Sequence, residues 1–229
     1  MTSIVVIGKS HTACIKAAAL RTADPSVKVI NLNREDDVCP AELAKAHGRD
    51  RPLLVALSFQ GNTHNILCLG EHPQKMTIGG VQVDEEERTS IPHSVFRDVL
   101  KLIIEDRMVE FLEEYRTAFA GAEIVMVLPP PPLAKVVQHG GIAPVLADAL
   151  KQGVMPMHVR RTAYECQTEL YREIAANQGI MCLEPPPQAL DEDGMLGHQY
   201  GSNDPTHANE VYGALVLAQL KELTHAAVE

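Results

Sequence analysis

The sequence predicts an α/β fold in which helices cover both faces of a parallel sheet. Short apolar runs rich in Val and Ile indicate buried strands, and stretches with helical periodicity separate them. This alternation continues through 229 residues, an ordinary length for one α/β domain. We therefore expect a single doubly wound domain over residues 1–229, built on a central parallel five-stranded sheet, with an insertion at about 70–92.

Five segments are predicted as strands. The first is a β-branched apolar run that ends at a glycine, and the third is apolar throughout, as suits a strand covered on both faces. Prolines end the fourth and the fifth. The five segments are Ser3–Gly8, Val27–Leu32, Pro52–Ser58, Glu123–Leu128 and Ile180–Leu183.

Helices are expected between these strands. The segment His11–Arg21 is rich in Ala, and Pro40–His47 is a short helix stopped by Gly48. From Val95 to Phe119 the apolar residues recur with a period of 3.6. A capping box, Thr162-Ala-Tyr-Glu165, predicts the start of a helix that ends at Gly179, and the last helix covers about Ala208–Leu223.

Three segments lie outside this alternation or at its margins. The long polar stretch Gly70–Pro92, with an acidic run at 84–87, is typical either of a lid or binding loop or of a solvated insertion without a direct role. The stretch Leu183–Gly201 is rich in Pro, Gly and Asp and leads into the last helix. At His158–Arg161 we expect surface charge at a helix start rather than a contribution to the crevice.

Composition excludes several classes of function. The formal net charge of −10 and the 4% of aromatic residues disfavour a nucleic-acid partner. No run approaches the ~20 apolar residues of a membrane helix, and no signal-peptide pattern opens the chain, so we expect a cytoplasmic protein without a membrane partner. The five cysteines lack C-x-x-C spacing, which predicts buried thiols, with no metal and no cofactor.

Polar residues that could carry chemistry follow two strands and precede the last helix, where the ligand crevice of a doubly wound sheet lies. Ser10 could be an exposed nucleophile or a helix N-cap. Asn62 could donate to an oxyanion or simply form a Gly-Asn turn. Asp204 could orient the imidazole of His207 or cap the helix. Together they provide a nucleophile, an oxyanion donor and an oriented base.

The segments around these residues resemble the sequence blocks of the SGNH/GDSL hydrolases. Gly8-Lys-Ser10 looks like the Gly-Asp-Ser block, and Gln60-Gly-Asn-Thr63 looks like the Gly-x-Asn-Asp block. Asp204-Pro-Thr-His-Ala-Asn209 looks like the Asp-x-x-His-Pro-Asn block, and Asp193–Leu196 is similar to the stretch before it. The resemblance covers most of the chain apart from 70–92, and it implies a flavodoxin-like SGNH hydrolase fold.

The resemblance also implies roles for individual residues. Ser10 would be the nucleophile, His207 the base and Asp204 its orienter. Asn62 and the backbone N–H of Ser10 would form the oxyanion hole. The family usually adds a glycine N–H from the loop after the second strand, for which Gly48 is the nearest candidate here.

The sequence departs from the family pattern at Lys9, Gln60 and Thr63. Lys9 and Gln60, together with His11 and His64, are candidates for substrate binding, although each histidine could instead be a satisfied core residue or an exposed one. If both histidines lined the pocket, it would be cationic and suited to an anionic or sugar-like ester. A metal site formed by His11, His64 and His207 has no local ligand pair to support it.

Three functions remain open from the sequence. The first is an esterase that cleaves a small acyl ester, such as an O-acetylated sugar, or a lipid or thioester, through an acyl-Ser10 intermediate. The second is an acyltransferase that uses the same intermediate. The third is an inactive carbohydrate-binding or accessory protein on this scaffold. The expected partner is a small-molecule ester, and a homo-oligomer is compatible with the sequence.

Overall fold

The computed structural model describes residues 3–34, 39–47, 54–59, 61–79, 88–136 and 144–226. Its central sheet has five parallel strands in the order β2-β1-β3-β6-β7, so the five predicted strands and the predicted sheet are confirmed. The sheet strands therefore follow the spatial order 2-1-3-4-5, which is one of the two common doubly wound orders. The strands are β1 (Ile4–Gly8), β2 (Val27–Asn31), β3 (Leu54–Ser58), β6 (Glu123–Val127) and β7 (Met181–Leu183).

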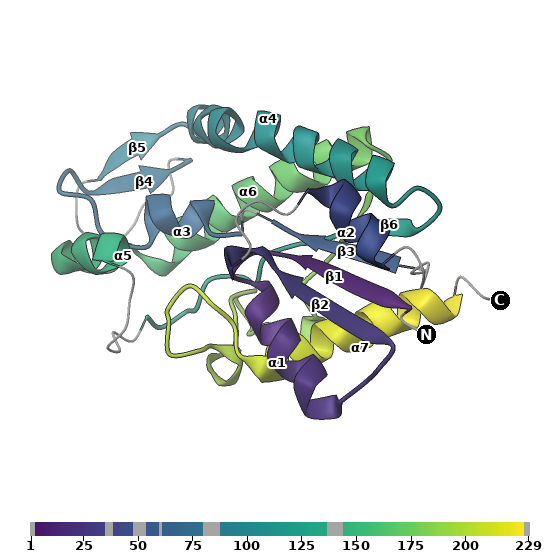
Figure 1. The fold of residues 1–229 in the computed structure, drawn as a ribbon. Helices are drawn as coiled ribbons and strands as arrows, with labels where there is room; N and C mark the ends of the chain where they lie inside the picture. The colour runs from purple at the N-terminus through teal and green to yellow at the C-terminus, as the bar shows by residue number, and fades with distance from the viewer. Residues whose placement is uncertain are drawn as a thin grey trace.

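Two groups of helices sandwich this sheet (Figure 1). On one face Ile4 and Val6 pack with α1 (Thr12–Thr22) and α7 (Glu210–Ala226). On the other face Val5 and Ile7 pack with the second group of helices. This group consists of α2 (Pro40–His47), α4 (His93–Ala118) and α6 (Met157–Asn177). Neighbouring residues of β1 thus enter opposite cores, which explains why its sequence is apolar throughout.

Four short elements were not predicted. They are α3 (Thr63–Cys68), α5 (Pro144–Ala149), β4 (Met76–Ile78) and β5 (Thr89–Ile91). The two strands form a small parallel ladder within the insertion, where Ile78 is buried in the core. An ion pair of 2.7 Å between Arg88 and Glu71, both nearly buried, links the two sides of the insertion. The insertion is thus partly built into the domain, while its acidic run lies outside the described residues.

Two predicted helix starts were wrong. Helix α6 begins at Met157, five residues before the capping box, because Pro156 supplies a compatible start and accepts the backbone N–H of Arg160 at 3.1 Å. Helix α7 begins at Glu210, because Ala208 still forms an extended bridge with Gly201. The side chain of Asn209 caps this helix by accepting the N–H of Val211 at 2.9 Å.

Among the helices in the described ranges, α1 and α7 have the most extensive contact, and they lie side by side in Figure 1. A Cβ atom at Gly213 would stand 2.2 Å from the carbonyl oxygen of Cys14, so only glycine fits. Ser10 directly precedes α1, and His207 lies just before α7. This contact therefore brings together two segments of the chain that carry candidate site residues.

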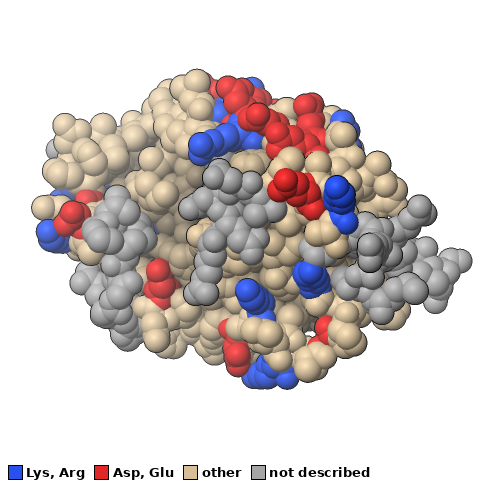
Figure 2. Space-filling view, viewed as in Figure 1, with Lys and Arg blue, Asp and Glu red and all other residues tan. Residues whose placement is uncertain are grey.

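The surface of the protein carries acidic patches, as its net charge of −10 predicts, and three of its cysteines are buried, as expected. Acidic side chains gather over α4 in Figure 2. All five cysteines are free thiols, and Cys14, Cys68 and Cys166 are buried. Among the helices of the described ranges, none combines the length and the apolar character that a membrane span requires.

Candidate functional site

The candidate site lies at the carboxyl edge of the sheet, where β1 and β3 end side by side. Gly8 is in register with Ser58, and a Cβ atom at Gly8 would stand 2.1 Å from the Ser58 carbonyl oxygen. The N–H of Lys9 donates to that same oxygen at 3.2 Å. Glycine at position 8 thus allows the chain to leave β1 tightly against β3 and to enter the turn that holds Ser10.

Ser10 is partly exposed in the turn before α1. Its carbonyl accepts the N–H of Ala13, but its hydroxyl makes no hydrogen bond within the described part of the chain. The N-cap position belongs to His11, and no side chain caps this helix. The alternative role of Ser10 as an N-cap is therefore not what the structure shows.

Asp204, Thr206 and His207 form a compact hydrogen-bonded group before α7. Asp204 Oδ1 accepts the Thr206 N–H at 2.7 Å and the Thr206 hydroxyl at 2.6 Å. Nδ1 of His207 lies 2.9 Å from Thr206 Oγ1 and 3.2 Å from Asp204 Oδ1. Because the oxygen atoms of both neighbours can accept a hydrogen bond, the network places the imidazole hydrogen on Nδ1 and leaves Nε2 as an acceptor.

The protonation of Asp204 follows from these contacts. Burial raises the pKa of Asp204, but the hydrogen bonds from His207 and Thr206 outweigh burial and hold the pKa well below its usual value. The carboxylate is therefore ionised at neutral pH and can stabilise positive charge on His207. Sequence reasoning found the Asp–His pair but missed Thr206, whose hydroxyl joins the two.

Asn62 reaches the same imidazole from the β3–α3 turn. Its Nδ2 lies 3.4 Å from His207 Nε2, and its Oδ1 accepts the Asn65 amide at 3.3 Å. Because Oδ1 is engaged by Asn65, the amide nitrogen is the end that faces His207. The structure thus brings Asn62, Asp204 and His207 together, while Ser10 Oγ makes no hydrogen bond to His207 among the described contacts.

The two candidate substrate-binding histidines are buried. His11 is 8% exposed and His64 is 1% exposed. Burial lowers the pKa of His11 to about 3, helped by the neighbouring His207 and His64, and lowers the pKa of His64 to about 4. Both rings are therefore neutral near pH 7, so the expectation of a cationic pocket is corrected.

A buried glutamine that the sequence analysis missed holds the Asn62 turn. Gln167 of α6 is fully buried, and its Oε1 accepts the His64 backbone N–H at 2.7 Å and lies 3.2 Å from His64 Nδ1. Its Nε2 donates to the Gly61 carbonyl at 3.3 Å. The available signal was a polar residue on the mainly apolar buried face of α6, next to the apolar Cys166 and Leu170.

Arg160 is also buried, contrary to the expectation of surface charge at 158–161. Its guanidinium donates to the carbonyls of Met155 at 2.9 Å and Ala134 at 2.8 Å, and also to that of Leu133. Leu133 and Ala134 lie in the loop after β6 and Met155 lies just before α6, and the hydrogen bonds to their three carbonyls compensate for the burial of the guanidinium. The neighbouring Arg161 is exposed and pairs with Glu165 on the same helix.

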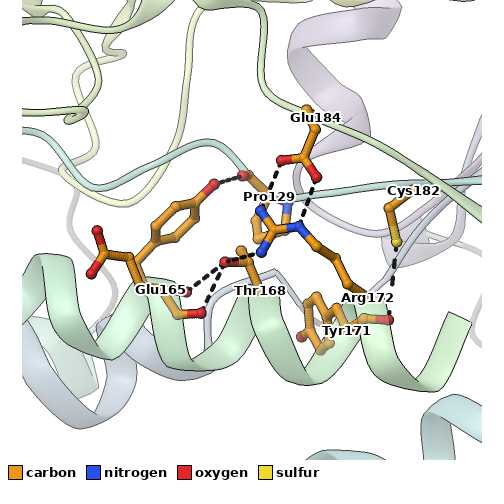
Figure 3. A network of polar contacts seen from close by, with 8 residues as sticks. Pro129, Glu165, Thr168, Tyr171, Arg172, Cys182 and Glu184 are labelled. Carbon is orange, nitrogen blue, oxygen red and sulfur yellow. Dashed lines mark hydrogen bonds and ion pairs between the residues drawn. The ribbon is translucent and has the colours of Figure 1, made fainter. Parts of the chain in front are cut away.

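Helix α6 also fixes the chain that leaves β6 and β7 (Figure 3). The Tyr164 hydroxyl donates to the Pro129 carbonyl at 3.0 Å, directly after β6. Arg172 binds both carboxylate oxygens of Glu184 at 2.7 and 2.8 Å, directly after β7. One helix therefore positions three of the loops at the carboxyl edge.

The remaining predicted residues do not add to this geometry. Lys9 is exposed beside Ser10. Gln60 and Gly48 lie outside the described residues. In the described ranges, no cluster of three or more histidine, cysteine or acidic side chains is arranged to hold a metal ion.

Comparison with known proteins adds evidence on the fold. No family model matches the sequence, and no curated protein matches it. Three solved structures are similar over most of this chain. A provisionally assigned platelet activating factor from Streptococcus pneumonia is matched over 97% of this chain and 83% of its own, with 11% identity and a TM-score of 0.54. Phospholipase A1 from Streptomyces albidoflavus is matched over 94% of this chain and 98% of its own, with 12% identity and a TM-score of 0.51.

The third is a provisionally assigned acylhydrolase from Bacteroides fragilis, matched over 99% of this chain and 88% of its own, with 11% identity and a TM-score of 0.50. At such low identities these similarities bear on the fold. Together with the strand order, they confirm the predicted architecture: the chain has the SGNH/GDSL hydrolase fold.

Proposed function

We propose that this protein is a serine hydrolase that cleaves a carboxylic ester through an acyl-Ser10 intermediate. The observation that carries the proposal is the Asp204–Thr206–His207 group with the Asn62 amide at Nε2, at the same sheet edge as the partly exposed Ser10. An imidazole with Nδ1–H bonded and Nε2 open as an acceptor is the form that a general base requires. The fold shared with acylhydrolases supports the same class of reaction.

In the first half of the reaction, the Ser10 hydroxyl attacks the acyl carbon. A bond forms between Oγ and that carbon, and the hydroxyl proton passes to His207 Nε2. The ionised Asp204 stabilises the resulting imidazolium. The carbon–oxygen bond to the alcohol then breaks, and the alcohol leaves with the proton from Nε2. Water attacks the acyl-enzyme by the same route, which releases the acid and restores Ser10.

Asn62 has two partners in this proposal. In the free protein its Nδ2 lies at His207 Nε2. When negative charge develops on the substrate oxygen, the same N–H would turn to that oxygen, together with the backbone N–H of Ser10. His207 Nε2 would then be open to the Ser10 hydroxyl. The absence of a Ser10–His207 bond before substrate binds is common for catalytic contacts, which often tighten only in the complex.

We propose a small neutral ester, such as an O-acetylated sugar, as the substrate. The buried histidines are neutral, so they supply no positive charge for an anionic one. A cavity of about 390 Å³, within the size range of small-ligand sites, lies between the loop after β6 and residues 190–199, and Ser10, Asn62 and His207 are not among the residues that line it. Leucines 133, 190 and 196 form part of its wall. Lys135, Asp191 and Gln199 supply polar groups with one charge of each sign, a combination that suits a neutral sugar ring.

The nucleophile is tested by replacing Ser10 with alanine. We expect Ser10→Ala to lower kcat on p-nitrophenyl acetate and on an acetylated monosaccharide by about 10³-fold or more, because the acyl-enzyme cannot form. The matched control is Ser94→Ala, an exposed serine at the start of α4. A fluorophosphonate should label Ser10 in the native chain. Undiminished turnover by Ser10→Ala, or labelling of another residue, would contradict the proposal.

A further inference from the structure

The ring of His11 occupies a central position in the candidate site that the reaction above does not use. It is 8% exposed, and its centroid lies 5.1 Å from that of His207, with the two rings tilted by 36°. On its other side it contacts the Gly61–Asn62 turn. His11 therefore stands between the two segments that carry the Asn62 amide and the His207 imidazole.

The fit between His11 and the turn is steric. A Cβ atom at Gly61 would stand 2.1 Å from Cδ2 and 2.4 Å from Nε2 of His11. Real Cβ atoms do not approach other heavy atoms this closely, so the ring occupies the space that any side chain at position 61 would need. Gly61 and His11 are thus complementary in shape.

The Asn62 side chain lies near the His11 ring and favours its charged form, but burial outweighs this effect. Both Nδ1 and Nε2 are buried without a hydrogen-bond partner in the described residues. Burial holds the pKa of His11 at about 3, below any pH at which the site would act, so the ring is uncharged. An uncharged ring packed against both segments acts on them mainly through its volume.

We propose that His11 is a positioning residue that holds the Asn62 turn and the His207 ring in place by packing against both. The inference rests on the proposed hydrolase function. It assigns a steric role to the residue that follows the nucleophile: the ring of His11 supports both the oxyanion donor and the base, and it takes no part in proton transfer. An apolar side chain of similar volume should therefore replace it.

Four variants test this role with p-nitrophenyl acetate. We expect His11→Ala to lower kcat by about 10–100-fold with KM changed little, because an error of about 1 Å in position has effects of this size. His11→Leu and His11→Phe should keep kcat within about threefold of the native value, and the pH profile of kcat should be unchanged. Gly61→Ala should resemble His11→Ala, because its Cβ displaces the ring. Thermal unfolding of each variant identifies any that does not fold. If either His11→Leu or His11→Phe does not fold, the other still tests the role of volume.

The double variant Gly61→Ala/His11→Ala completes the test. Because the alanine at 11 leaves room for the new Cβ, the double variant should be no slower than His11→Ala alone. Additive losses in the double variant, or a loss in His11→Leu and His11→Phe as large as in His11→Ala, would overturn the inference. His225→Phe, at an exposed histidine in the last turn of α7, is the control. Ser10→Ala is measured alongside: if it stays active, the proposed function fails, whatever the His11 variants do.

Discussion

At the scale of single residues, Thr206 is the contact that links the candidate base to its orienting carboxylate. Its hydroxyl donates to Asp204 at 2.6 Å and lies 2.9 Å from His207 Nδ1, closer than the carboxylate at 3.2 Å. It is 4% exposed, so water does not replace these bonds easily. The orientation of the imidazole thus depends on a hydroxyl as much as on the carboxylate.

Replacing Thr206 with valine removes this hydroxyl and keeps the shape of the side chain. We expect kcat to fall about 10-fold, since Nδ1 then depends on the longer bond to Asp204 alone. Thr206→Ser restores the hydroxyl and should retain most of the activity. Steady-state kinetics of the three proteins checks this. Equal activity of Thr206→Val and the native protein would show that Asp204 alone orients the ring.

At the scale of elements, the seam between α1 and α7 has little tolerance for added volume. A Cβ at Gly213 would meet backbone atoms of Cys14 and Ile15, which cannot move aside without shifting a helix. The exposed face of α4 has the opposite character, since Leu102 is 87% exposed there. The two helical layers thus differ in how strongly packing constrains them.

Gly213→Ala is expected to destabilise the fold by about 1–3 kcal/mol, although alanine favours a helix over glycine by about 1 kcal/mol. The gain in helix propensity is outweighed by the overlap with α1. Ala218 is an exposed residue of the same helix, so Ala218→Gly measures the effect of helix propensity alone, for the reverse exchange of alanine by glycine. Urea unfolding measures both. A Gly213→Ala protein more stable than the native one would mean that the helices separate without cost.

At the scale of the whole molecule, the buried histidines tie stability to pH. In the unfolded chain each histidine takes up a proton near pH 6.5, whereas in the fold His11 and His64 do so only at about pH 3 and 4. Below pH 6.5 the unfolded state therefore binds more protons, and acid favours it. Above pH 6.5 the burial of the two neutral rings does not lower the free energy of unfolding. Below pH 6.5 it lowers this free energy increasingly, until the pH reaches the pKa values of the folded state.

We expect the free energy of unfolding to fall between pH 6.5 and 4.5 by up to about 1.4 kcal/mol per pH unit for each of the two histidines. His11→Leu removes one of these protons, so its unfolding free energy should depend less steeply on pH than that of the native protein. Urea titrations at several pH values measure the two slopes, and carboxylates shared by both proteins cancel in the comparison. Identical slopes would show that His11 is not held neutral in the fold.

The sequence predicted the sheet because its strands are apolar on both faces, a pattern that appears without any tertiary information. It did not predict β4, β5, α3 or α5, which are three to six residues long and too short to show a period. It misplaced Arg160, because two of the three carbonyls that allow its burial, those of Leu133 and Ala134, belong to a segment more than 25 residues earlier. Gln167 was missed for the same reason, since its partners His64 and Gly61 are about a hundred residues away. Thr206 has neighbouring partners, but the family block leaves its position unspecified and only the geometry of the turn shows that its hydroxyl joins Asp204 to His207.

The contact at Gly213 also bears on how this protein could be engineered. Cys14 lies one turn after Ser10, and Gly213 lies less than two turns after His207. The contact that limits the distance between α1 and α7 therefore lies close to both Ser10 and His207. It is made by backbone atoms, which cannot repack as side chains can. Libraries aimed at new substrates should leave this seam unchanged, and a cysteine at Leu102 offers a point for immobilisation on the opposite helical layer.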